Sequence, residues 1–78
     1  MSAEEFRRQT EENFDEKVES LRTAVKKAYE EGRRGTEPTF SATVPDGLNS
    51  FMIDVVVREW EADGFTVTKM SNRLNFQA

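Results

Sequence analysis

Hydrophobic residues concentrate in residues 47–64, which hold the only tryptophan and most of the large aliphatic residues of the C-terminal half. At about 100° per residue, the apolar side chains cover roughly two-thirds of a helix circumference. The run at residues 55–57 would also suit a strand, because β-branched residues favour strands. We expect a helix, since Asp46 can cap its start and Gly64 can follow its end as a left-handed residue. Polar residues also recur at helical spacing: Ser50, Asp54, Arg58 and Glu61.

A second, longer helix is predicted over residues 3–31. Ser2 and Glu5 have the spacing of a capping box, and Gly32 is the first glycine, which we expect to end the helix as a left-handed residue. The apolar stripe of this helix consists of Phe14, Val18, Leu21, Val25 and Ala28. Phe6 lies at the edge of the stripe with few apolar neighbours. We therefore expect the first three turns to project from the domain or to pack on a partner.

Three segments alternate between apolar and polar residues, which is typical of strands with one buried face: residues 39–44, 65–69 and 73–77. Residues 32–38 form a linker, and the short polar loop between the last two segments predicts a β-hairpin. The order α-β-α-β-β predicts a single α+β domain over residues 1–78. It consists of two layers, a three-stranded, mostly antiparallel sheet with two helices on one face.

The strand order is less constrained by the sequence than the elements themselves. The first and second strands should be joined through the central helix by a right-handed crossover. This favours an order with the third strand in the middle, antiparallel to both neighbours. The alternative is direct pairing of the first strand with the second.

Composition limits the chemistry that is open to this chain. It contains no cysteine and no histidine among 78 residues, so thiol nucleophiles, thiolate metal sites and the usual general base are missing. We expect a non-enzymatic protein with no catalytic site, no metal and no cofactor. The first residues lack the apolar stretch of a signal peptide, and no run reaches membrane-spanning length. We therefore expect a cytoplasmic protein with no membrane partner.

One short segment is basic within an acidic protein whose net charge is −4. Its five cations are Arg22, Lys26, Lys27, Arg33 and Arg34, which we call the basic cluster. They could bind phosphate, nucleic acid or an acidic protein surface. The simpler explanation is that cations stabilise the negative end of the helix dipole. Arg33 and Arg34 should carry any anion binding, because they lie beyond the intrahelical pairs open to Lys26 and Lys27.

Two other polar surfaces allow a functional and a simple explanation. The acidic stretch consists of Glu11, Glu12, Asp15, Glu16 and Glu19. It could imitate a nucleic-acid backbone or dock on a basic partner, or it could be a solvated helix face. The outer face of the sheet would carry Thr39, Ser41, Thr43, Thr66, Thr68, Arg73, Asn75 and Gln77. Proteins that bind single strands place aromatic residues on such a face, and none is predicted here. We interpret this face as solvated.

The end of the chain contains two recognisable segments. Residues 61–67 are Glu-Ala-Asp-Gly-Phe-Thr-Val, and residues 73–76 are Arg-Leu-Asn-Phe. This ending resembles that of many small accessory proteins of large tailed bacteriophages, in which a helix closes on Asp/Asn-Gly-aromatic-x-Val and a Leu-x-aromatic strand follows. The resemblance covers the C-terminal quarter. It implies a small phage protein, in the host cytoplasm or the virion, that binds another protein, and it transfers no site residues.

Excess hydrophobic surface on both helices predicts self-association, because a domain of this size buries a limited share of its surface. We expect a homodimer through the first helix, with the central helix beside the interface. The residues involved are Phe14, Val18, Leu21, Val25, Met52, Val56 and Trp60. The resulting hypothesis is a protein-interaction module that binds itself and an unidentified protein. The alternative is a nucleic-acid, nucleotide or phosphate binder that uses the basic cluster.

Overall fold

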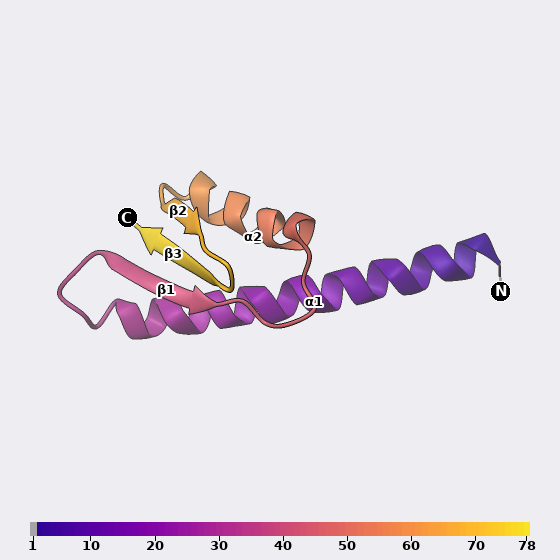
Figure 1. The fold of residues 1–78 in the computed structure, drawn as a ribbon, viewed down its shortest axis with the longest axis horizontal. Helices are drawn as coiled ribbons and strands as arrows, with labels where there is room; N and C mark the ends of the chain where they lie inside the picture. The colour runs from indigo at the N-terminus through magenta and orange to yellow at the C-terminus, as the bar shows by residue number, and fades with distance from the viewer. Residues whose placement is uncertain (1) are drawn as a thin grey trace.

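The computed structural model describes residues 2–78 and has the predicted α+β architecture (Figure 1). Its elements are α1 (Ala3–Gly32), β1 (Thr39–Thr43), α2 (Ser50–Ala62), β2 (Thr66–Lys69) and β3 (Arg73–Gln77). The sheet order is β1-β3-β2, and β3 is antiparallel to both neighbours. The order with the third strand in the middle is therefore confirmed.

The two ends of α2 show one wrong and one correct prediction. Asp46 does not cap the helix; the Asn49 side chain accepts a hydrogen bond of 2.9 Å from the Met52 N–H, so α2 begins at Ser50. The residues before Asn49 form a turn instead, in which Gly47 has a φ of 86°. At the other end Gly64 has a φ of 99°, as predicted. The Phe65 N–H reaches back to the Trp60 carbonyl at 3.2 Å, which completes a Schellman motif.

Gly32 is needed for space rather than for a left-handed conformation, so its predicted role is wrong. It is the last residue of α1, and Arg33 follows with right-handed backbone angles. A Cβ atom added at Gly32 would lie 2.6 Å from Cβ of Phe40. The chain therefore has glycine at this position because β1 returns very close to the end of α1.

The core forms where the stripe of α1 meets the helix-facing side of the sheet and one face of α2. Its buried residues are Val18, Leu21, Val25, Ala42, Val56, Val57, Leu74 and Phe76. Four of the residues predicted for self-association, Val18, Leu21, Val25 and Val56, thus lie inside one copy of the chain. They offer no free surface for a partner. Phe14, Met52 and Trp60 are partly buried against the same core.

The aromatic residues gather around Phe40 of β1. Its ring stacks on that of Phe76 with a centroid distance of 4.5 Å. It also meets Tyr29 of α1 at 5.8 Å and Trp60 of α2 at 5.6 Å. Phe65, which follows α2, packs against Trp60 at 5.1 Å. One residue of an edge strand therefore touches both helices and the central strand.

The first turns of α1 extend beyond the rest of the molecule, as expected from the sequence (Figure 1). Residues 3–13, which we call the arm, are all exposed, and Phe14 is the first partly buried residue of the helix. The arm gives the molecule principal extents of 53 × 21 × 19 Å. Within residues 2–78, neither helix is long and apolar enough to cross a membrane.

We predict that Gly32→Ala destabilises the domain by about 1–3 kcal/mol, the usual range for overpacking a close contact. Alanine favours a helix over glycine by up to about 1 kcal/mol, so propensity alone predicts the opposite sign. Chemical denaturation monitored by circular dichroism checks this. Glu31→Ala, an exposed change in the same turn, is the control and should be close to neutral. A stabilised Gly32→Ala variant would show that β1 can move away from α1.

We predict that Leu21→Glu unfolds the chain rather than producing a folded monomer. Leu21 is 0% exposed, so the change buries an unpaired carboxylate in the core. Circular dichroism should show loss of the native signal, whereas Thr23→Glu on the exposed side of α1 keeps it. A folded Leu21→Glu protein with a cooperative melt would contradict the central position of Leu21.

Candidate functional site

The structure divides the basic cluster between different partners. Arg22 donates to Glu59 of α2 from Nη2 at 2.8 Å and from Nε at 3.0 Å, and to Glu19 at 3.3 Å. Hydrogen bonding to Glu59 is the main reason that the pKa of Arg22 is raised above its ordinary value. This cation therefore connects α1 to α2 and is not free for a ligand.

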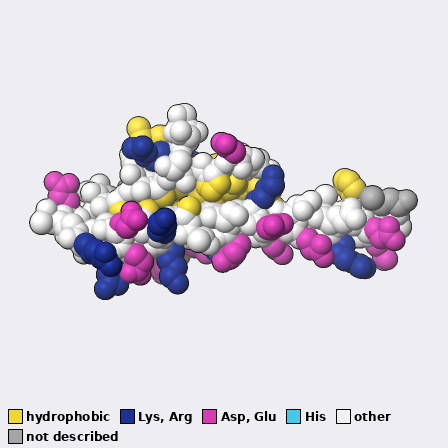
Figure 2. All heavy atoms as spheres, turned by 90° about the horizontal axis from the view of Figure 1, so that it is seen from below, with side chains coloured by type: hydrophobic (Ala, Val, Ile, Leu, Met, Phe, Trp, Pro, Cys, Tyr) yellow, Lys and Arg dark blue, Asp and Glu magenta, His cyan; other side chains and the backbone are white. Residues whose placement is uncertain are grey.

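The remaining cations of the basic cluster do not form one surface. Arg33 pairs with Glu30 at 3.3 Å, so the expectation that it stays unpaired along the helix is wrong. Lys26, Lys27 and Arg34 make no ion pair with any residue in the range 2–78. In Figure 2, Lys and Arg side chains alternate with Asp and Glu side chains along the molecule. The face in view has no continuous basic patch.

A groove between the second half of α1 and the end of α2 contains part of this cluster. It has a volume of about 360 Å³, and Tyr29 and Trp60 contribute its aromatic lining. Its charged residues are Arg22, Lys26, Glu30, Glu59 and Asp63. Carboxylates outnumber cations here, and Arg22 is already paired. The groove therefore does not have the charge that an anion site requires.

The acidic stretch lies where the arm joins the body of the molecule. Its five residues are exposed, and Glu19 pairs with Arg22. Lys17 lies within the stretch and donates to the Gly47 carbonyl at 3.0 Å, which connects α1 to the turn before α2. Part of this segment thus stabilises the fold, and the rest faces solvent.

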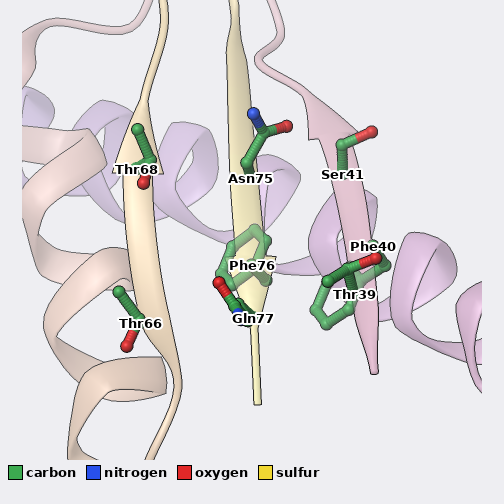
Figure 3. A pocket seen from close by; sticks show the side chains of 8 residues that line it. All are labelled: Thr39, Phe40, Ser41, Thr66, Thr68, Asn75, Phe76 and Gln77. Atoms are coloured by element: carbon green, nitrogen blue, oxygen red, sulfur yellow. The ribbon is translucent and has the colours of Figure 1, made fainter. Parts of the chain in front are cut away.

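The outer face of the sheet forms a shallow depression of about 440 Å³ (Figure 3). Strand pairing aligns its polar side chains in two rows across the sheet. One row is Thr68, Asn75 and Ser41, and the other is Thr66, Gln77 and Thr39. These groups can donate and accept hydrogen bonds but carry no charge. Phe40 and Phe76 also line the depression, but they alternate with the polar residues and belong to the helix-facing side.

The sequence drew attention to Phe6, but not to Phe51 or Met70, which the structure also leaves exposed. In the described part of the chain, the exposed large hydrophobic residues are Phe6 at 61%, Phe51 at 67% and Met70 at 56%. Phe51 lies at the start of α2, and its ring packs against that of Phe14 at 5.8 Å. A helical wheel could have indicated this, because Phe51 lies about 140° from the core residue Val56.

The groups that usually support catalysis are sparse in this structure. Residues 2–78 contain no group of three or more carboxylates, histidines or cysteines arranged to hold a metal ion. No buried side-chain polar atom among these residues lacks a hydrogen-bond partner. The contacts that the surface offers to a ligand include hydrogen bonding on the sheet face and apolar contact around Phe6 and Phe51.

Comparison of the chain with protein-family models, with curated proteins and with solved structures found no match.

We predict that the basic cluster does not retain the protein on heparin. The triple variant Lys26→Ala, Lys27→Ala, Arg34→Ala should elute with the wild type, because neighbouring carboxylates and the net charge of −4 oppose anion binding. Glu30→Gln with Glu59→Gln, which frees Arg33 and Arg22, should elute later. Wild-type retention above about 0.3 M salt that the triple variant loses would instead identify an anion site.

Proposed function

We propose that this chain is a non-enzymatic protein-interaction module that associates with itself and covers a surface of another protein. The observation that carries the proposal is the arm. It extends from the body as a helix, its residues are all exposed, and it presents Phe6 to solvent. At its base the exposed ring of Phe51 packs against the partly buried Phe14 and forms a second aromatic site.

The arm makes a suitable binding element because one end of the helix is already fixed. Isolated helices shorter than about 12–15 residues are marginal in water, since nucleation is costly. Here α1 is nucleated by the packed segment that contains Leu21 and Val25. A partner that binds the arm therefore orders few additional residues. Helices recognised in this way usually contribute one face with a few large apolar anchors, and Phe6 is such an anchor.

The charge distribution supports a protein partner over nucleic acid. Arg22 and Arg33 of the basic cluster are paired within the chain. On the face in Figure 2, acidic side chains lie between basic ones. The resemblance of the C-terminal segments to phage accessory proteins adds a host or virion protein as the kind of surface to be covered. No observation favours the nucleic-acid alternative.

We predict that wild-type protein exceeds its monomer mass of 9.0 kDa as its concentration rises, and that Phe6→Ala with Phe51→Ala stays at that mass. Both side chains are exposed, so their removal should leave the thermal melt nearly unchanged. Light scattering coupled to size exclusion over about 1–200 μM checks this, because interfaces below the standard size are typical of weak, transient association. Met70→Ala is the control, since Met70 is also exposed but lies in the loop after β2.

A wild-type mass of 9.0 kDa at every concentration would contradict self-association. Binding to another protein is tested separately by capture from cell extract with wild type and with Phe6→Ala. A protein captured equally by both would show that the arm is not its docking site.

A further inference from the structure

We infer that the arm is the contact between two copies of the chain and that the two arms run antiparallel about a two-fold axis near Thr10. In this arrangement Phe6 of each copy packs against Phe14 and Phe51 of the other. The inference rests on the proposed self-association and specifies its geometry.

The two exposed aromatic sites lie on one side of α1. At about 100° per residue, Phe6 and Phe14 differ by roughly 80° around the axis, and Thr10 lies midway between them. They are separated along the axis by about 12 Å. Because Phe51 packs beside Phe14, the anchor and the site that would receive it share one surface.

An antiparallel pair satisfies both sites at once. A two-fold axis perpendicular to the helix at residue 10 places residue 6 of one copy opposite residue 14 of the other, and the reverse. Such an interface is isologous and closed, so association stops at the dimer. A parallel pair would place Phe6 opposite Phe6, so Phe6 would not reach Phe14 and Phe51 of the other copy.

The polar groups around the axis are compatible with this contact. The Thr10 hydroxyl donates to the Arg7 carbonyl at 2.9 Å, so it is satisfied within the helix. Glu5, Arg8, Glu12 and Asp15 lie on the opposite side of α1 at about 100° per residue. The contacting side therefore has few charges, which is typical of interface cores.

The charges that flank the contacting side also favour the antiparallel arrangement. Arg7 and Glu11 lie on the same flank, and like flanks meet in an antiparallel pair. Arg7 of one copy then lies within about one helical turn of Glu11 of the other, twice in the dimer. In a parallel pair like flanks lie on opposite sides of the interface, so this pairing of Arg7 with Glu11 is lost.

Single cysteines test the geometry, because the chain has none of its own. Under mild oxidation Thr10→Cys should form a covalent dimer, since residue 10 lies on the axis. Ala3→Cys should not, because residue 3 faces residue 17 of the other copy. Glu12→Cys, on the opposite side of the helix, is the control for random collisions. The disulfide yield at position 10 should exceed that at positions 3 and 12 at least tenfold.

The outcomes separate this inference from the proposed function. Rapid cross-linking of both Thr10→Cys and Ala3→Cys would show a parallel pair, and would overturn the geometry while keeping self-association. A dimer mass for all three reduced variants, with no cross-link above the Glu12→Cys control, would place the interface elsewhere. A monomer mass for the unmodified protein would overturn both proposals.

Discussion

The packing of Phe40 is the contact on which the arrangement of this small domain depends. One ring contacts Tyr29 of α1, Trp60 of α2, Phe65 after α2 and Phe76 of β3. Aromatic pairs contribute about 0.5–1.5 kcal/mol each beyond the area that they bury, so several on one side chain are a large share of a marginal stability. Gly32 allows this contact, because any side chain there would collide with Phe40. Without cysteines the chain has no disulfide to replace it.

Local patterns in the sequence were enough to predict the elements and their order. Alternation gave the three strands, and the spacing of Ser2 and Glu5 gave the start of α1, where the Glu5 N–H donates to Ser2 at 3.2 Å. Two assignments that depend on tertiary contact were wrong, the cap of α2 and the role of Gly32. Asp46 and Asn49 are equally good caps by residue type, and in the structure Asn49 caps the helix. Gly32 has the position expected of a helix-ending glycine, but glycine is required there because β1 passes too close for a side chain.

The candidate sites were harder to predict, because their properties depend on residues far apart in the chain. Arg22 meets Glu59, which lies 37 residues away, and no local pattern indicates that this cation is already neutralised. Four residues of the predicted self-association surface are buried within one copy for a related reason. Each helix taken alone has more apolar surface than one contact would bury. In the structure the two apolar faces cover each other, and Leu21 and Val56 lie in one core. The outer sheet face was predictable, since strand alternation alone places Thr39, Ser41 and Asn75 on one side.

A helix as polar as the arm would have no reason to remain ordered in water if it stood alone. Its order comes from α1 beyond Phe14, where three buried residues hold the helix against the sheet and α2. This difference between the free arm and the packed part of α1 also explains why the hydrophobic stripe does not continue to the N-terminus of the helix. A continuous stripe would leave a large apolar patch on the free helix and cause unspecific aggregation. In the proposed dimer, one exposed phenylalanine on an otherwise polar helix gives weak attachment, and selectivity comes from the second contact at Phe51.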